Sequence, residues 1–408
     1  MILPSRREGL LLGSQFLGSA SSAVALSVGI LLSSAITDSV VMASLVRASG
    51  WLATAVFARP LNELTVRRGR ATGILAGWIL AVVGISSVLT ASITGSTATL
   101  LIGMVFGGAG SASMLQARFA VAEALPESER AGSLTRFTWA GALGSILGPS
   151  VGVAVTTVTP FVPASEFTRS YVIALAMISL GMICVILFAI TNRASGRSSI
   201  LTPSDNSTAA NEHLITTTTR ARPSIPALGV SLVAVQFVMT GAMTAAPLHL
   251  MQTGWGTAEI GLAISFHMAG MYLFAPVFAH LFNRFGAARI SVAVGLVLSG
   301  LMIMSLFVTS AAADVARLFL IGVAWSGIQI PVTLELTRQA SGQDRSALRS
   351  QGRVDMSSSI AAGLGIALSG LFLVQVGYAH IQAGYGLLML VATGYTLFSR
   401  EKRGSHEE

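Results

Sequence analysis

The sequence predicts an all-α membrane protein with twelve transmembrane helices in two related six-helix bundles. Three observations support this fold class. Of the 408 residues, 53% are hydrophobic and only 10% are charged, whereas a soluble domain has about 25% charged residues. The apolar residues gather in twelve long runs, and the basic residues gather between alternate runs. Because one soluble core cannot bury so much apolar side chain, a soluble enzyme, a disordered chain and a coiled coil are excluded.

Each apolar run is long enough for a transmembrane helix, which needs about 20 residues to cross the bilayer core. The least regular runs are the second, which Arg47 interrupts, and the eleventh, which opens on Asp355. The runs cover residues 10–34, 39–58, 71–93, 97–121, 133–157 and 170–191 in the first half, and 227–250, 258–282, 289–310, 313–336, 352–376 and 380–399 in the second.

A polar segment rich in Ser and Thr, residues 192–225, separates the sixth run from the seventh. Its composition predicts a flexible cytoplasmic linker. We therefore expect an N-terminal six-helix bundle over residues 1–191 and a C-terminal six-helix bundle over residues 226–408. The first run follows a short basic stretch, but it is longer than the roughly 7–15 residues of a signal-peptide core, so we expect an uncleaved helix.

The basic residues indicate how the chain is oriented in the membrane. With the N-terminus inside, 22 of the 25 Lys and Arg residues fall in or beside the inner segments, and the exceptions are Arg47, Arg169 and Arg317. Cytoplasmic loops of membrane proteins carry such an excess. We therefore expect both termini in the cytoplasm, and we interpret the net charge of +8 as a topological signal rather than as a sign of nucleic acid binding.

The sequence contains no pattern that predicts a cofactor or a catalytic site. The single cysteine, Cys184, permits neither an intrachain disulfide nor a cysteine-ligated metal site. No His/Cys/Glu cluster with metal-ligand spacing is present, so no metal is expected. The phosphate-binding Gly-x-x-x-x-Gly-Lys-Ser/Thr motif is also missing, which argues against ATP-driven transport within this chain. No nucleophile–base arrangement points to an enzyme.

An internal repeat relates the two halves at a fixed offset of 217 residues. Two halves with the same inside–outside sense form a parallel repeat, whose axis runs along the membrane normal. In such folds the substrate site lies between the halves near the midplane of the membrane. The matches are Leu10 with Ala227, Arg67-x-Gly69 with Arg284-x-Gly286, and Gly144-x-x-x-Gly148 with Ala361-x-x-x-Gly365.

Twelve spans, a long central loop and Arg-x-Gly turns after spans two and eight resemble the major facilitator superfamily. The fifth span, Gly144-Ser-Ile-Leu-Gly148-Pro149-Ser-Val-Gly152, is similar to the antiporter signature of its exporters, including proton-coupled drug exporters. Glycines at a spacing of four let helices approach closely, and Pro149 loosens the backbone ladder. Helix packing by small residues is the alternative explanation. The resemblance implies a secondary transporter of the bacterial inner membrane, usually a monomer.

The chain departs from the superfamily pattern in two places. The loop after span two, normally Gly-x-x-x-Asp-Arg-x-Gly-Arg, here runs from Asn62 to Arg70 without its first glycine and its aspartate. By analogy, Arg70 would pair with Glu123 and stabilise one conformation, and the missing aspartate removes part of that contact. Gly103 stands near the place of the span-four arginine of drug exporters. Four other stretches resemble a bacterial branch of permeases: Leu115–Arg118, His267–Tyr272, Gly322–Trp325 and Gln351–Asp355.

Three ionisable residues are candidates for proton coupling, because a charged group at the bilayer centre costs about 2.5–3.5 kcal/mol on insertion scales and is a functional candidate by default. His267 lies near mid-depth in span eight, where it either exchanges protons or stays neutral and bonds a neighbouring helix. Asp355 either carries protons or pairs with the nearby inner arginines. Asp38, at the outer boundary, is the third candidate.

Polar side chains at helical spacing are candidates for the substrate cavity, since spans one, four, seven and ten line it in the superfamily. Hydrogen bonding between helices is the alternative for these faces. Arg47 either pairs with Asp38 or attracts an anionic group, and Arg118 either pairs with Glu123 or lines the inner vestibule. Methionines nearby suit a partly apolar substrate, or belong to the core or the lipid face. The faces are Gln15, Ser19 and Ser22; Gln236, Thr240 and Thr244; Trp325, Gln329 and Thr333; the methionines are Met239, Met243, Met268 and Met271.

These features predict a transporter that exports a small, partly hydrophobic organic solute by alternating access and proton antiport. The preference for export depends mainly on the glycine pattern of the fifth span. An alternative is a proton-coupled importer or a uniporter of a metabolite such as a sugar or an organic acid. A second alternative is a receptor or scaffold that uses the same fold without transport.

Overall fold

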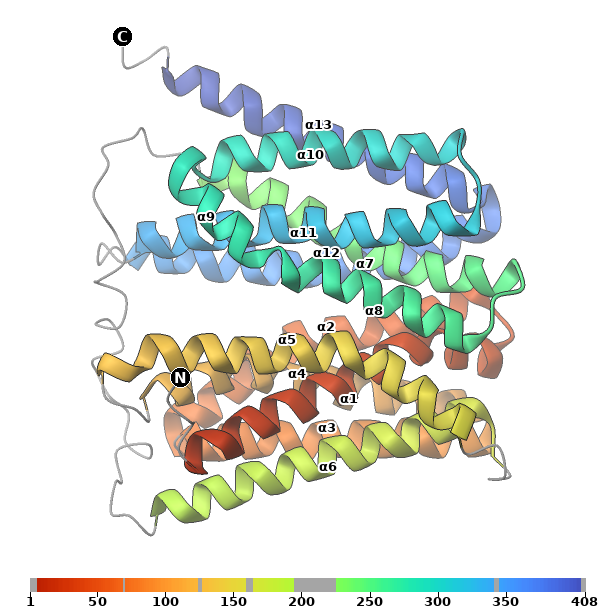
Figure 1. Cartoon of the computed structure of the whole chain (residues 1–408), viewed down its shortest axis with the longest axis vertical. Helices are drawn as coiled ribbons and strands as arrows, with labels where there is room; N and C mark the ends of the chain where they lie inside the picture. The colour runs from red at the N-terminus through yellow and green to blue at the C-terminus, as the bar shows by residue number, and fades with distance from the viewer. Residues whose placement is uncertain are drawn as a thin grey trace. The chain divides into compact units, whose positions relative to one another are not determined.

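The computed structural model of the chain describes residues 6–68, 70–123, 127–158, 164–193, 225–340 and 345–404. Within these residues the only regular secondary structure is helical (Figure 1). The helices are α1 (Arg6–Thr37), α2 (Val40–Arg68), α3 (Arg70–Thr94), α4 (Thr97–Glu123), α5 (Glu127–Val158), α6 (Glu166–Arg193), α7 (Ile225–Gln252), α8 (Thr257–Leu273), α9 (Ala275–Phe285), α10 (Ala287–Ile303), η2 (Met304–Leu306), α11 (Ala311–Ala340), α12 (Arg345–Val376) and α13 (Tyr378–Gly404).

The all-helical membrane fold predicted from the apolar runs is confirmed. Ten of the twelve runs are each covered by a single helix to within a residue, the eighth run is covered by α8 and α9, and the ninth by α10 and η2 as far as Leu306. Helices form because backbone groups in lipid must find their hydrogen-bond partners inside the same segment. Among the described residues, ten helical segments are long and apolar enough to cross a membrane. The described apolar part of α4, Thr97–Ala112, is shorter. Several helices continue past the apolar run at the end that the arginines place inside.

The eighth span differs from the prediction, because it consists of two helices rather than one. α8 ends at Leu273 and α9 begins at Ala275, with a proline in the first turn of α9. Pro276 has no N–H to continue the helical ladder, and its ring crowds the preceding turn. α9 in turn ends at Phe285, and the next residue, Gly286, has a φ of 77° and a ψ of 162°, which are accessible to glycine but not to other residues. The second Arg-x-Gly turn therefore needs its glycine.

The chain divides into two compact units. Unit 1 comprises Met1–Asp205 together with Trp255–Ser265, and unit 2 comprises Asn206–Gly254 together with Phe266–Glu408. The first part of α8 thus belongs with unit 1, which the sequence did not indicate. Most of the predicted linker lies outside the described residues.

Corresponding spans pack in the same way within each unit. In unit 1, α1 packs against α5 and α6, and in unit 2, α7 packs against α12 and α13 (Figure 1). Side chains of α1, α3 and α6 form the main apolar core of unit 1, with Val28, Trp78 and Tyr171 among its buried members. This core packs the sixth span against the first and the third.

One close contact between helices repeats at the offset of 217 residues. A Cβ atom at Gly148 of α5 would lie 2.5 Å from the carbonyl oxygen of Ala20 in α1. In unit 2, a Cβ atom at Gly365 of α12 would overlap the carbonyl oxygen of Phe237 in α7. Residues 20 and 237, like 148 and 365, are 217 positions apart. The repeat seen in the sequence is therefore also a repeat of tertiary contacts.

Candidate functional site

The glycines of the fifth-span motif all face the first helix. A Cβ atom at Gly144 would overlap the carbonyl oxygen of Phe16, and one at Gly152 would lie 2.8 Å from Cγ1 of Val24. With Gly148 between them, these positions bring the backbone of α5 against α1 over two turns. Pro149 lies buried inside α5 without ending the helix. The motif therefore sets how closely the first and fifth spans approach.

In unit 2, the structure joins two of the predicted cavity faces. The indole Nε1 of Trp325 in α11 donates a 2.9 Å hydrogen bond to Oε1 of Gln236 in α7. One turn further along α7, the Thr240 hydroxyl donates to the carbonyl oxygen of Ala362 in α12 at 3.0 Å. Gln329 donates to Thr333 at 3.2 Å on a more exposed part of α11. The polar face of α7 thus bonds two neighbouring helices.

The polar face of the first span is less uniform than predicted. Nε2 of Gln15 donates to Oγ of Ser19 at 3.3 Å. Both side chains lie against Gly141 of α5, where a Cβ atom would be 2.6 Å from Nε2 of Gln15. Ser22 is exposed. Two of the three residues therefore contact the fifth span, and the third does not.

The four methionines that the sequence placed near the cavity are buried in unit 2. Met239 and Met243 of α7 and Met268 and Met271 of α8 are each 5–6% exposed. Of the alternatives open from the sequence, the lipid-facing position does not fit this burial. These side chains give the interior of unit 2 a soft apolar surface.

His267 is completely buried in α8. Its Nδ1 lies 2.6 Å from the carbonyl oxygen of Leu318 in α11, and since a carbonyl can only accept, Nδ1 carries the hydrogen. Nε2 is buried without a partner among the described residues. Gly322, one turn beyond Leu318, leaves room for the ring, since a Cβ atom there would be 3.2 Å from Nδ1. This is the bonded histidine that the sequence left open, with one nitrogen still able to accept a proton.

Arg47 of α2 is buried, with 7% of its surface exposed. Asp38 is exposed in the turn after α1 with a φ of 47°, and among the described residues no hydrogen bond or ion pair joins it to Arg47. The guanidinium instead reaches the space over Gly29, where a Cβ atom would lie 3.1 Å from both Nη1 of Arg47 and the hydroxyl oxygen of Tyr171. Nε of Arg47 is buried without a partner in the described part of the chain. Buried charges are normally paired. Of the two alternatives for Arg47, the attraction of an anionic group is therefore favoured over a pair with Asp38.

Several predicted residues lie outside the residues or side chains that the structure describes, so their roles stay predictions. Arg67 is described and is exposed near the end of α2. Its counterpart Arg284 lies over the ring of Phe285, 5.4 Å from the ring centroid. Gly69 lies outside the described residues. The structure describes the backbone but not the side chains of Arg70, Arg118, Glu123 and Asp355.

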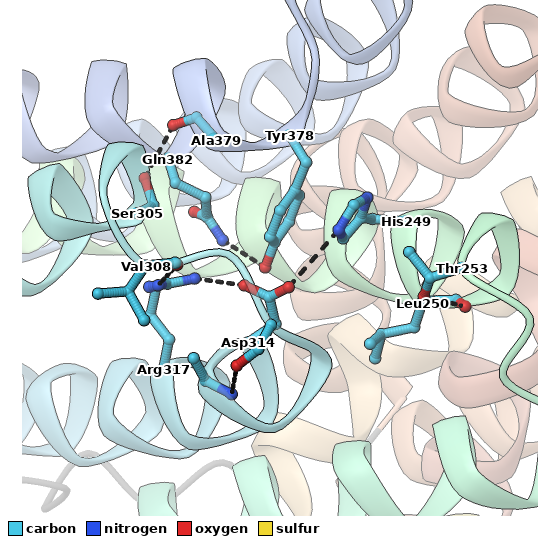
Figure 2. Close-up of polar contacts among 12 residues, drawn as sticks. His249, Leu250, Thr253, Ser305, Val308, Asp314, Arg317, Tyr378, Ala379 and Gln382 are labelled. Atoms are coloured by element: carbon cyan, nitrogen blue, oxygen red, sulfur yellow. Dashed lines mark hydrogen bonds and ion pairs between the residues drawn. The ribbon is translucent and has the colours of Figure 1, made fainter.

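A cluster of ionisable residues that the sequence analysis did not single out lies in unit 2 (Figure 2). Asp314 in the first turn of α11 forms an ion pair with Arg317, and both are about 5% exposed. His249 from the last turn of α7 approaches from the other side, with its Nε2 3.5 Å from Oδ2 of Asp314. Its ring stacks on Tyr378, the first residue of α13, at 4.3 Å between centroids and 8° between planes.

Two signals in the sequence point to this cluster. Asp314 and Arg317 are three residues apart at the start of the tenth span, a spacing that places opposite charges side by side on a helix. His249 ends the seventh span and Tyr378 opens the twelfth. All four residues therefore lie at the span ends that the arginine pattern places outside. Arg317 was also one of the three basic residues away from the inner side.

A second ion pair that the sequence analysis did not predict lies in unit 1. Nη2 of Arg136 lies 2.6 Å from Oε1 of Glu8, which is only 7% exposed, and Nε of the same arginine donates to that oxygen at 2.7 Å. The contact joins the first turn of α1 to α5. It reinforces the packing that the fifth-span glycines create.

The chain thus combines a repeated six-span unit, a face of glycines on α5 and buried polar residues within its apolar helices. The sequence model of the Major Facilitator Superfamily matches residues 10–333 and 228–408. The chain belongs to the major facilitator superfamily. Two uncharacterized MFS-type transporters of Bacillus subtilis are similar to it. YdeG is 28% identical over 396 residues, covering 95% of this chain and 90% of YdeG, and YddS is 25% identical over 389 residues, covering 94% and 88%.

Solved structures of the superfamily share the fold. A bacterial homolog of the human lysosomal transporter Spinster has a TM-score of 0.71 at 14% identity, with 98% of each chain covered. A POT family transporter in complex with 5-aminolevulinic acid has a TM-score of 0.67 at 15% identity, with 96% of this chain and 95% of the other covered. The fucose:proton symporter FucP of E. coli has a TM-score of 0.57 at 16% identity, with 96% and 98% covered. The chain is thus a multi-pass membrane protein and a secondary transporter of a small molecule, not an enzyme.

Proposed function

We propose that the chain exports a small, partly hydrophobic organic solute across the bacterial cytoplasmic membrane by alternating access, in exchange for protons. The observation that carries this proposal is the contact between α5 and α1. The fifth-span glycines, which resemble the antiporter signature, are the positions where α5 presses on the α1 backbone. Small residues at this spacing let the backbones of two membrane helices approach closely, and the resemblance to the antiporter signature is what connects this contact with export. We place the chain as a monomer with both termini inside.

The buried side chains support the chemical class of the solute. The methionines of α7 and α8 give adaptable apolar surface beside the Gln236–Trp325 pair, which suits an organic molecule with few polar groups. Arg47 adds a positive charge without a bonded acid among the described residues. An exported solute with one anionic group, such as a carboxylate, fits this combination.

Among the predicted coupling residues, His267 has the geometry that best suits proton exchange. Its Nδ1–H···O bond to Leu318 fixes the ring, and Nε2 is left as the proton acceptor. Asp38 is exposed at the chain turn, which suits a surface role better than coupling. Replacing His267 by Gln keeps a donor for Leu318, so the fold should persist while pH-dependent transport is lost.

The test of the function is a comparison of a deletion strain with an overproducing strain of the host bacterium. Intracellular metabolites are measured by mass spectrometry, and susceptibility to hydrophobic organic acids and other drugs is measured in parallel. Export predicts at least one solute that accumulates in the deletion strain, is depleted in the overproducer and is more toxic to the deletion strain. The opposite pattern, with uptake lost on deletion, would support the importer, and no difference in any solute would refute the proposal.

A further inference from the structure

The cluster around Asp314 is built from charges that are almost completely removed from solvent. Asp314 and Arg317 are 5% and 4% exposed. A buried ion pair is stable only when its remaining donors and acceptors are also satisfied. Arg317 donates to Oδ1 of Asp314 and also, at 3.1 Å, to the carbonyl oxygen of Val308. The second carboxylate oxygen, Oδ2, is left for His249.

His249 is the member of the cluster that solvent can reach. Its side chain is 28% exposed, whereas that of Asp314 is 6% exposed. The separation of 3.5 Å between Nε2 of His249 and Oδ2 of Asp314 is longer than that of a well-formed hydrogen bond or of a charge-assisted contact. A proton on the ring would therefore turn a weak contact into a charge-assisted one.

The histidine ring is held in place by α13. Tyr378 stacks on it face to face at 4.3 Å, and Nε2 of Gln382, which is fully buried, donates to the Tyr378 hydroxyl oxygen at 2.6 Å. An aromatic face also accommodates a cation, so this stack suits the protonated ring as well as the neutral one. Figure 2 shows His249 of α7, Asp314 of α11 and Tyr378 of α13 converging. Tyr378 and Gln382 are positioning residues.

We propose that the imidazole of His249 and the carboxylate of Asp314 form a proton-binding site at the outer end of unit 2, and that proton binding there, together with His267, is required for exchange with the exported solute. The link to solute exchange rests on the function proposed above, whereas proton binding at this site does not. The ionisable groups that face His249 among the described residues are Asp314 and Arg317 from α11 and Tyr378 from α13.

The binding step involves one proton and no other reactant. The free ring nitrogen of His249 accepts the proton with its lone pair, and the neutral imidazole becomes an imidazolium. The pair of Asp314 and Arg317 is neutral as a whole, so the cluster then carries one positive charge. The imidazolium and Arg317 bind different oxygens of the same carboxylate, Oδ2 and Oδ1, and compete for its single negative charge, so proton binding strengthens the tie between α7 and α11. Proton binding is thereby linked to how the ends of these two helices are joined.

The test uses the full chain in lipid nanodiscs with ¹⁵N in the histidine rings, and the probe is the proton alone. Imidazole resonances are followed from pH 8 to pH 5, and His249→Gln assigns one signal among the six histidines. The proposed site requires that proton binding by His249 responds to both neighbouring charges. Asp314→Asn should weaken that binding at least about tenfold, because a full charge 3.5 Å away is lost. Arg317→Met should tighten it, because the competing cation is gone.

The exposed His280 of α9 lies outside the cluster and serves as the control in the same spectra, where its resonance should not change between the variants. A His249 signal that stays constant from pH 8 to pH 5 would overturn the site. So would equal proton binding by His249 in the wild type, Asp314→Asn and Arg317→Met, which is the result expected if the cluster only stabilises the fold. Should Asp314→Asn not fold, the wild type and Arg317→Met still decide the matter.

The coupling half is tested separately in inside-out membrane vesicles with an acidic interior, using the solute that the metabolite comparison identifies. His249→Gln should reduce accumulation driven by the pH gradient to the level seen without a gradient, while exchange of labelled solute at equal pH continues. If His249→Gln accumulates solute as fast as the wild type, the coupling half is wrong. If the wild type itself accumulates nothing, the proposed export fails, and the ring titration alone decides the proton site.

Discussion

A methyl group added at Gly148 tests the contact between the first and fifth spans. It would lie 2.5 Å from the Ala20 carbonyl oxygen and 2.9 Å from Cβ of Ala23. Atoms in van der Waals contact sit about 3.5–4.0 Å apart, so α5 must move away from α1 by roughly 1 Å. Overpacking of this size costs about 1–3 kcal/mol, which outweighs the gain of up to about 1 kcal/mol from replacing a helical glycine.

The assay is reversible unfolding in mixed micelles by SDS titration, followed by circular dichroism. Gly148→Ala should lower the free energy of unfolding by about 1–2 kcal/mol, and Gly365→Ala should do the same, because its contact is the counterpart in unit 2. Gly300→Ala is the matched control: a Cβ atom there meets nothing within 4 Å on exposed α10, so the variant should be as stable as the wild type or more stable. A Gly148→Ala protein as stable as Gly300→Ala would refute the close contact.

Four further substitutions test other contacts of the chain by the same titration. Arg47→Met should not lower the free energy of unfolding, since a buried guanidinium without a bonded acid is unfavourable, yet it should abolish export of solutes with an anionic group; a loss of several kcal/mol would mean that Arg47 has a structural partner. Trp325→Phe and Gln236→Leu should each lower stability by about 1 kcal/mol, and the double variant should lose less than the sum; full additivity would contradict the hydrogen bond. Gly286→Ala should lower stability by about 1–3 kcal/mol because of its positive φ, and a neutral result would show that the turn adopts another conformation.

The sequence was sufficient for the fold because the bilayer restricts the possible structures. Long apolar segments in lipid must be helical, so the helix positions follow from composition alone. The offset of 217 residues also predicted a real correspondence, since the contact of Gly148 with α1 recurs at Gly365 with α7. The break at Phe274 was not predicted, because an apolar run does not report how a proline in its middle is accommodated.

The sequence was less informative about which polar residues meet. Spacing along one helix grouped Gln236 with Thr240, but the partner of Gln236 is Trp325 on a helix 89 residues away. In the same way, His249 and Asp314 are 65 positions apart in the sequence, but packing brings their side chains to 3.5 Å from one another. The proposed pairing of Arg47 with Asp38 rested on short sequence separation, whereas burial of one residue and exposure of the other separates them. Contacts between helices depend on tertiary packing, which periodicity alone does not encode.

The central claim is proton-driven export of a small organic solute by this chain alone. The most direct measurement uses purified protein in proteoliposomes, the solute identified by metabolite comparison, and an imposed pH gradient with the acidic side matching the outer face. The account predicts that the solute moves against its concentration gradient toward the acidic side and that a protonophore abolishes this movement. Transport at the same rate with and without the pH gradient, or no transport by the purified protein, would contradict it.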